Sequence, residues 1–317
     1  MIFQRLRGRF GLSDPIETGE SGDHTKSVTT RIMKIGRLLP GFIKDPLSRA
    51  LSAVLNYVGV DFLRDYVHRR QGIGNVGPIE ISGEKFLIEH VLPRLLDKEQ
   101  PVMFDVGANV GHYSKALYSA FPKAQIVAFE PVPRTFEVLC ATLATTTVKC
   151  CSMGLSDVEG DAIIYDYDHV DGSEHASLFP GVLKDLHRAK TIKEINVPLI
   201  TLDAYCCAAS IPGIDFLKID TEGNDLKVLK GSQAMIQKNA IRAIQFEFNQ
   251  TNVFSHVFLK DFYDILRGYS FYRLLPHALL PLGRYSPHNE IFAFQNILAL
   301  NDAFIGDSLV APFVSCR

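Results

Sequence analysis

The feature that most constrains the fold is a short apolar run followed by a glycine-rich turn. Val102–Phe104 is apolar and has no helical period, which predicts a buried β-strand ending near Asp105. Residues 112–121 then follow a helical pattern. A strand, a glycine turn and a helix in this order are typical of a nucleotide-binding β–α turn, where free N–H groups of the helix face the ligand. The turn residues are Gly107, Ala108, Asn109 and Gly111.

The spacing in this turn favours a nucleoside over a dinucleotide. A dinucleotide site needs a second glycine where the backbone touches the pyrophosphate, and this chain has Asn109 there. The side-chain amide of Asn109 can hydrogen-bond a ligand. A nucleoside without a pyrophosphate, such as S-adenosylmethionine, fits this pattern better. A nicotinamide oxidoreductase is therefore disfavoured.

An acidic residue ends the next apolar segment. Gln125–Phe129 is a second predicted strand, and Glu130 follows it. A carboxylate about 20 residues after the glycine turn is placed to accept hydrogen bonds from both ribose hydroxyls. The turn alone would fit a plain loop equally well, but the turn combined with Glu130 predicts a nucleoside site.

Two later segments also end in carboxylates. Residues 214–220 and 241–247 are predicted strands that deliver Asp220 and Glu247 at their tips. Ligands in open α/β sheets bind beyond these tips. Two carboxylates that face one cleft raise the pKa of one of them, which suits a general base. Asp220 and Glu247 are the first candidates for the catalytic base, and His256 is the next.

Four segments together resemble the FkbM-type methyltransferases, over about residues 80–300. They are Asp105–Gly111, Glu130–Pro133, Leu217–Gly223 and Val228–Gly231. The resemblance implies an α/β fold of the Rossmann-like class I methyltransferase type, with a mostly parallel sheet and an antiparallel hairpin at its C-terminal edge. It also implies S-adenosyl-L-methionine as the cofactor. The predicted cofactor-binding residues are Asp105, Gly107, Ala108, Asn109, Gly111, Glu130, Ser156, Asp157 and Asp220.

The roles of Ser156 and Asp157 rest on the resemblance. In the family this pair follows the third strand, here residues 148–152, and lies where the adenine is held. A carboxylate accepts a hydrogen bond from the adenine amino group. An ordinary turn explains a Ser-Asp pair before Glu159 and Gly160 about equally well.

The resemblance implies methyl transfer to an acceptor oxygen, often on a sugar or a specialised metabolite. Two alternatives stay open. One is a Mg²⁺-assisted transfer, because carboxylate and amide oxygens suit this ion; the side chains concerned are Asp220, Glu222, Glu247 and Asn249. The other is a nucleoside-binding or interaction protein without catalysis. We predict no metal site, because His169 and His175 lack a tight ligand spacing.

The net charge, the cysteines and the hydropathy of the chain indicate which partners and which cellular compartment to expect. The formal net charge of −2 gives no sign of nucleic-acid binding, so we expect a small-molecule or glycan acceptor. The six cysteines lack zinc spacing and predict reduced thiols in a cytoplasmic protein. Neither a signal peptide nor an apolar run of about 18 residues is visible.

The domain boundary is placed in the glycine-rich loop at residues 72–78. Residues 1–75 are predicted to form a helical, partly mobile extension, and residues 76–317 the methyltransferase domain. Residues 31–45 fit a short packed helix or a membrane-surface helix. The apolar stripe of residues 46–70 fits a core contact or a homodimer contact.

Several local elements of the methyltransferase domain are also predicted. Residues 82–97 are expected to form one helix capped by Ser82, and residues 223–238 another. An insertion near residues 160–200 suits a substrate-gating loop; its expected elements are strands at 162–165 and 196–200 and a basic helix at 182–193. The last two strands are expected at 270–275 and 290–298, paired as a hairpin.

Overall fold

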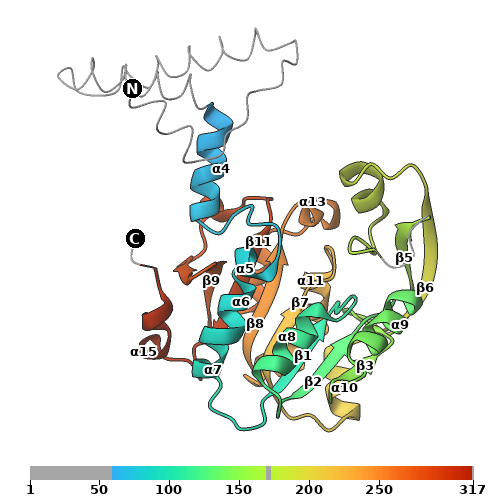
Figure 1. Ribbon diagram of the computed structural model, residues 1–317, viewed down its shortest axis with the longest axis horizontal. Helices are drawn as coiled ribbons and strands as arrows, with labels where there is room; N and C mark the ends of the chain where they lie inside the picture. The colour runs from blue at the N-terminus through green and yellow to red at the C-terminus, as the bar shows by residue number, and fades with distance from the viewer. Residues whose placement is uncertain (1–58, 169–172, 316–317) are drawn as a thin grey trace, which may run out of the picture. The chain divides into compact units, whose positions relative to one another are not determined.

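The computed structural model describes residues 59–168 and 173–315 (Figure 1). The chain divides into two units, Met1–Tyr66 and Val67–Arg317. The predicted mobile start, the helix at 31–45, most of the stripe at 46–70 and His169 lie outside the described residues. The predicted boundary between residues 75 and 76 stays a prediction.

A mixed sheet of eight strands forms the centre of the second unit. Its order is β10-β9-β11-β8-β7-β1-β2-β3. The strands from β8 to β3 pair in parallel, whereas β9, β10 and β11 pair antiparallel at one edge. The predicted α/β fold is thereby confirmed. The bounds are β1 Val102–Val106, β2 Gln125–Phe129, β3 Lys149–Cys151, β7 Ile214–Ile219, β8 Ile241–Phe248, β9 Tyr269–Leu275, β10 Ala278–Pro281 and β11 Gln295–Asn301.

The apolar strands fill two cores, one on each face of the sheet. Successive side chains of a strand point to opposite faces. In β1, Phe104 packs into one buried cluster and Met103 into the other. In β7, Leu217 and Phe216 divide in the same way. The continuous apolar runs in the sequence are therefore strands covered by helices on both sides.

The antiparallel edge differs in detail from the prediction. The hairpin partner of β9 is β10, and β11 enters between β8 and β9. The strand predicted at 290–298 begins only at Gln295. Glu290 is instead bound to the first turn of α14 (Leu259–Ile265), where its carboxylate accepts from the backbone N–H groups of Leu259 and Lys260 at 2.8 and 2.9 Å.

Helices follow the parallel strands at the positions that the sequence indicates. Two of the predicted helices are nevertheless interrupted. The helix predicted at 82–97 spans residues 84–95 and is interrupted by a π-helical turn. It begins after Gly83, whose φ of 89° ends the preceding α5, so Ser82 does not cap it. The helix at 223–238 is divided at Gly231, which packs on the backbone of Ser156. The bounds are α5 Ile79–Ser82, α6 Glu84–Phe86, a π-helical turn Leu87–Val91, α7 Leu92–Leu95, α8 His112–Ala120, α9 Pro133–Thr142, α10 Leu202–Ala208, α11 Asp225–Lys230, α12 Gln233–Gln237, α13 Thr251–Ser255 and α15 Asp307–Val310.

The insertion forms a second sheet of three strands. These are β4 Gly154–Leu155, β5 Gly160–Tyr167 and β6 Ile192–Ile200, in the order β4-β6-β5. The predicted hairpin is found in the antiparallel pair of β5 and β6. The basic helix predicted at 182–193 is wrong: a π-helical turn covers only Val182–Leu186, and Arg188 with a φ of 54° ends it.

Three further observations concern the described residues. Helix α4 (Val60–Arg70) carries the last part of the predicted apolar stripe and has no buried side chain. The five described cysteines are free thiols, as predicted. No described helix combines the length and the apolar character needed to cross a membrane.

Candidate active site

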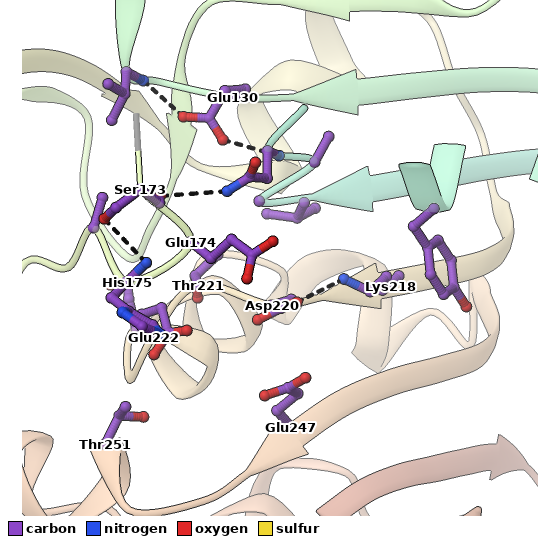
Figure 2. Close-up of a pocket in the computed structure, with 18 of the residues that line it drawn as sticks. Glu130, Ser173, Glu174, His175, Lys218, Asp220, Thr221, Glu222, Glu247 and Thr251 are labelled. Carbon is purple, nitrogen blue, oxygen red and sulfur yellow. Dashed lines mark hydrogen bonds and ion pairs between the residues drawn. The ribbon is translucent and has the colours of Figure 1, made fainter. Parts of the chain in front are cut away.

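A cavity of about 670 Å³ opens at the carboxyl ends of the parallel strands (Figure 2). This volume lies within the range of roughly 300–1,000 Å³ that small-molecule sites have. One side is lined by the glycine turn, Glu130 and the β4 residues Gly154 and Leu155. The other side is lined by the residues that follow β7 and β8. The insertion contributes Ser173–His175 and His187.

The glycine turn brings the ends of β1 and β7 close together. Gly107 has a φ of 81°, and a Cβ there would overlap the backbone carbonyl oxygen of Asp220. The N–H groups of Gly107 and Ala108 donate to the carbonyl of Phe129 at 3.0 and 2.9 Å. No residue other than glycine fits this position without moving a strand end.

Asn109 is used within the protein. Its Nδ2 donates to the carbonyl of Ser173 at 3.3 Å, and its Oδ1 accepts from the N–H of Val110 at 2.6 Å. The side chain therefore links the glycine turn to the insertion. Gly111 lies outside the cavity lining and lets α8 pack against Leu139 of α9, and its part in cofactor binding stays a prediction.

Glu130 lies at the end of β2 and is 6% exposed. Its Oε2 accepts from the N–H of Asn109 at 3.0 Å, and its Oε1 from the N–H of Val132 at 2.9 Å. Burial raises the pKa of Glu130 to about 7, against the opposing effect of these two hydrogen bonds. A carboxylate has about four acceptor positions, so each oxygen keeps capacity for a ligand hydroxyl.

Asp105 lies beneath the cavity. It is fully buried, accepts a hydrogen bond from Ser114 Oγ at 2.6 Å and has its Oδ1 3.9 Å from Lys218 Nζ. Burial raises the pKa of Asp105. Asp105 does not line the cavity. Its carboxyl group lies beside the ammonium of Lys218 and supports it.

The structure brings Asp220 and Glu247 to the same cavity, together with Glu222. Burial and the neighbouring Asp220 raise the pKa values of Glu247 and Glu222 well above their ordinary range. Glu247 Oε2 accepts a hydrogen bond from Asn249 Nδ2 at 3.1 Å. In the described part of the chain, no group of three or more His, Cys, Asp or Glu side chains is arranged to hold a metal ion.

Three other predicted residues lie apart from the cavity lining. Ser156 Oγ is 3.2 Å from Asp157 Oδ1 and from Asn224 Oδ1, and only the preceding β4 residues reach the cavity. His256 follows α13 with a φ of 56° and does not line the cavity either. His175, by contrast, lines it and stacks on His187 with the ring centroids 3.9 Å apart.

Several lining residues were not identified from the sequence. Lys218 had a usable signal, because it is a charged residue between two apolar residues of a buried strand. Glu84 was not identified because it lies in a segment whose sequence resembled a helix cap. Tyr113, Glu174 and His187 carried no pattern that distinguishes them from helix or loop residues, whereas Thr221 lies in the segment Leu217–Gly223 that resembles the family.

One family model and several known proteins match this chain. The family model described as the methyltransferase FkbM domain matches residues 105–271. Hexuronic acid methyltransferase AglP of Haloferax volcanii is 28% identical over 169 residues, which cover 53% of this chain and 62% of that protein. Methyltransferase sdnD of Sordaria araneosa is 30% identical over 157 residues, which cover 41% and 60%. The chain thus spans about three fifths of the length of these two relatives.

Two further proteins are similar at lower identity. The 2-O-methyltransferase NoeI of Sinorhizobium fredii is 24% identical over 194 residues, which cover 58% of this chain and 79% of that protein. Among solved structures, the methyltransferase FkbM from Methylobacillus flagellatus aligns over 76% of this chain and 60% of its own, with a TM-score of 0.39 and 12% identity.

Proposed function

Because the chain belongs to the FkbM methyltransferase family, we propose that it transfers a methyl group from S-adenosylmethionine to a hydroxyl oxygen of a small-molecule or glycan acceptor. The observation that carries the proposal is that one cavity joins the glycine turn and Glu130 on one side with Asp220 and Glu247 on the other. The proposed nucleoside site and two candidate bases therefore line the same cavity.

The residues present fit the cofactor. Glu130 retains acceptor capacity for ribose hydroxyls, and Gly107 leaves the turn without a side chain. Thr221 lines the cavity, and its buried Oγ1 has no hydrogen-bond partner among the described residues. An unpartnered buried hydroxyl in a ligand-sized cavity supports a polar ligand there. Ser156 and Asp157, which follow the lining residue Leu155, are proposed to lie beside the adenine.

The side chains have distinct proposed roles. When bound, S-adenosylmethionine supplies a methyl group that is activated by a positively charged sulfur. The protein mainly has to hold the acceptor oxygen in line with that methyl group and remove its proton. Asp220 and Glu247 are the groups proposed for the proton, since both face the cavity. His256 is the weaker candidate, because it lies outside the lining.

A sugar is the proposed acceptor class. Support comes from the names of two relatives, one a hexuronic acid methyltransferase and the other a 2-O-methyltransferase. The cavity lining includes carboxyl, hydroxyl and imidazole groups among apolar side chains, and these polar groups are able to hydrogen-bond the hydroxyl groups of a sugar. The homodimer, the cytoplasmic location and the absence of nucleic-acid partners stay predictions.

Calorimetry followed by a transfer assay tests the proposal. The chain is expected to bind S-adenosylmethionine and S-adenosylhomocysteine, and then to move a labelled methyl group to a member of a panel of sugars. A chelator in the same assay tests the Mg²⁺-assisted alternative, which requires that activity be lost and be restored by Mg²⁺. Absence of binding to both nucleosides would refute the proposed function. Binding without transfer to any hydroxyl compound would favour the non-catalytic alternative.

A further inference from the structure

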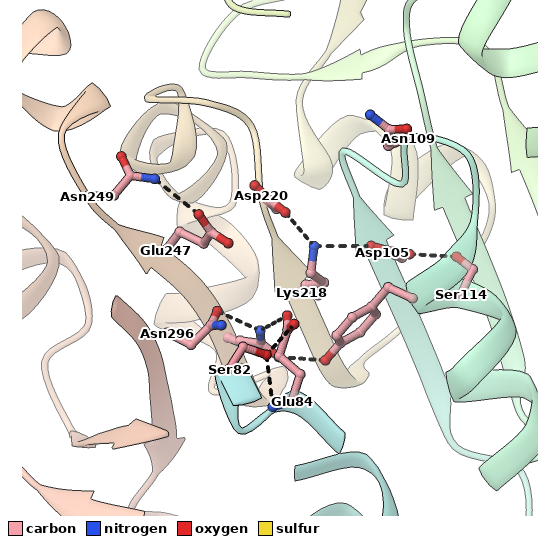
Figure 3. Close-up of polar contacts among 12 residues, drawn as sticks. Ser82, Glu84, Asp105, Asn109, Ser114, Lys218, Asp220, Glu247, Asn249 and Asn296 are labelled. Carbon is pink, nitrogen blue, oxygen red and sulfur yellow. Dashed lines mark hydrogen bonds and ion pairs between the residues drawn. The ribbon is translucent and has the colours of Figure 1, made fainter. Parts of the chain in front are cut away.

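Lys218 is a buried ammonium group at the base of the cavity. It is the last residue but one of β7 and is 4% exposed (Figure 3). Its neighbours in the strand are apolar. Burying a charge costs free energy unless the charge is paired, so Lys218 is expected to have charged or polar partners.

Three elements fix the position of this ammonium. Its Nζ is 2.9 Å from Asp220 Oδ2, at the tip of β7, and 3.9 Å from Asp105 Oδ1, on β1. It also lies 4.8 Å from the ring centroid of Tyr113, on α8. Both kinds of contact favour a cation. The ammonium of Lys218 is therefore held by contacts from β7, β1 and α8, and its closest partner is Asp220.

The surroundings of Lys218 are themselves tied together. The hydroxyl of Tyr113 donates to Gln245 Oε1 at 2.5 Å, and Gln245 Nε2 donates to Glu84 Oε1 at 2.9 Å and to Asn296 Oδ1 at 2.9 Å. Glu84 also accepts from Ser82 Oγ at 2.8 Å. This buried network connects α6, α8, β8 and β11, so Lys218 has little freedom to leave Asp220 (Figure 3).

The carboxyl groups around Lys218 determine its protonation state. Burial alone would lower the pKa of Lys218, but Asp220, Asp105 and Glu84 outweigh burial and raise it. Lys218 therefore stays charged and cannot act as a base at neutral pH. Glu247 is in the opposite situation, because it forms no ion pair with any described residue and burial raises its pKa.

We propose that Lys218 is a positioning residue that gives the two carboxyl groups opposite roles, with Asp220 held as the proton-accepting carboxylate and Glu247 kept protonated as a hydrogen-bond donor. This inference rests on the proposed function. As the acceptor oxygen gains the methyl carbon, the electron pair of the broken S–C bond stays on sulfur. The hydroxyl proton passes to Asp220.

Difference infrared spectroscopy at pH 7 tests the proposal without an acceptor, because it separates carboxylates from protonated carboxyl groups. Relative to the unmodified protein, Glu247→Gln is expected to lose a protonated-carboxyl band, whereas Asp220→Asn loses only carboxylate bands. In a Lys218→Met background, Asp220→Asn should instead remove a protonated-carboxyl band. Lys218→Arg, which keeps the charge, should restore the original pattern.

Three infrared results would overturn the inference. The first is loss of a protonated-carboxyl band on Asp220→Asn in the unmodified background, and the second is a protonated-carboxyl signal that is unchanged in Glu247→Gln. The third is an unchanged Asp220 signal in folded Lys218→Met. If circular dichroism shows that Lys218→Met is unfolded, the two single variants and Lys218→Arg decide the question. Calorimetry with S-adenosylmethionine is run separately, so that a failure of the proposed function is distinguished from a failure of this inference.

A kinetic comparison adds a second readout once an accepted sugar is known. Loss of a general base typically lowers kcat on the order of 10²-fold or more. Asp220→Asn is expected to reach that loss, and Glu247→Gln to lose less. Lys218→Met should lower kcat more than it changes the KM for S-adenosylmethionine, with partial recovery in Lys218→Arg. A larger kcat loss in Glu247→Gln than in Asp220→Asn would contradict the assignment.

Discussion

The backbone N–H of Asn109 and the carboxylate of Glu130 are joined by a hydrogen bond of 3.0 Å, although 21 positions separate them in the sequence. The bond ties the glycine turn after β1 to the end of β2. The group proposed to hold the ribose is therefore already oriented by the turn proposed to cradle the nucleoside. The first two predictions concern this pair.

Glu130→Ala is expected to weaken binding of S-adenosylmethionine by at least about tenfold. The variant removes the acceptor for the ribose hydroxyls, and a hydrogen bond to a charged group contributes about 1.5–3 kcal/mol. Calorimetry measures the change. The matched control is Glu137→Ala, which removes an exposed carboxylate from α9 and should leave the affinity unchanged. Equal affinities for the Glu130 variant and the unmodified protein would refute the ribose assignment.

The stability of the protein should fall as pH rises from about 4.5 toward 7. The pKa of Glu130 is raised from 4.5 to about 7 by burial, so the folded state holds this proton more tightly than the unfolded state does. This contribution is complete below the unfolded pKa and is lost as pH rises through the folded pKa.

Glu130→Gln cannot ionise and should remove that part of the pH dependence. A shift of this size corresponds to about 3 kcal/mol at most. Urea unfolding at pH 5 and pH 8 measures the difference between variant and unmodified protein. Parallel curves for the two proteins across this range would show that Glu130 does not ionise as described.

Gly107→Ala is expected to destabilise the fold by about 3 kcal/mol or more, the upper end of the usual cost of overpacking. The added methyl group would overlap the carbonyl oxygen of Asp220, and the φ of 81° is strained for alanine. Thermal or urea unfolding measures the loss. Gly306→Ala is the control, because a Cβ there meets nothing nearer than Ser308 Oγ at 4.0 Å. A Gly107 variant as stable as the control would mean that β1 and β7 do not meet at this turn.

Gln245→Ala should cost roughly 2–4 kcal/mol of stability. The variant leaves Glu84, Tyr113 and Asn296 without their shared partner, and each buried polar group left unpaired costs about 1–3 kcal/mol. Gln237→Ala, at an exposed position of α12, should change stability by less than about 0.5 kcal/mol. Similar small losses in both variants would show that the network adds nothing to stability.

The sequence predicted the strands and turns whose pattern is local. The run before Asp105 and the carboxylate at the end of β2 each follow from a few neighbouring residues. The hairpin of β5 and β6 was also predicted, because short apolar segments at 162–165 and 196–200 read as strands. These signals come from periodicity and from glycine, which act within a few residues.

The features that the sequence did not predict depend on contacts between segments that are far apart in the chain. Residues 187–193 have a helix-like composition, but from Ile192 onward the chain pairs with β5, and this pairing overrides the local preference. Glu84 and Gln245 meet across 161 positions, and no local pattern reports such a contact. Likewise, Ser156 and Asp157 come after the third strand as expected, but the short strand β4, which pairs with the distant β6, lies between and was not predicted.

The strand order has a consequence for biosynthesis. β8 lies between β7 and β11, and β11 is the last strand of the sheet in the sequence. As the chain leaves the ribosome, β8 has one open flank until residues 295–301 emerge. The half of the sheet that carries the glycine turn can form much earlier than the half that carries Glu247. A nascent chain is therefore expected to form the turn proposed to bind the nucleoside before it completes the edge of the sheet that carries Glu247.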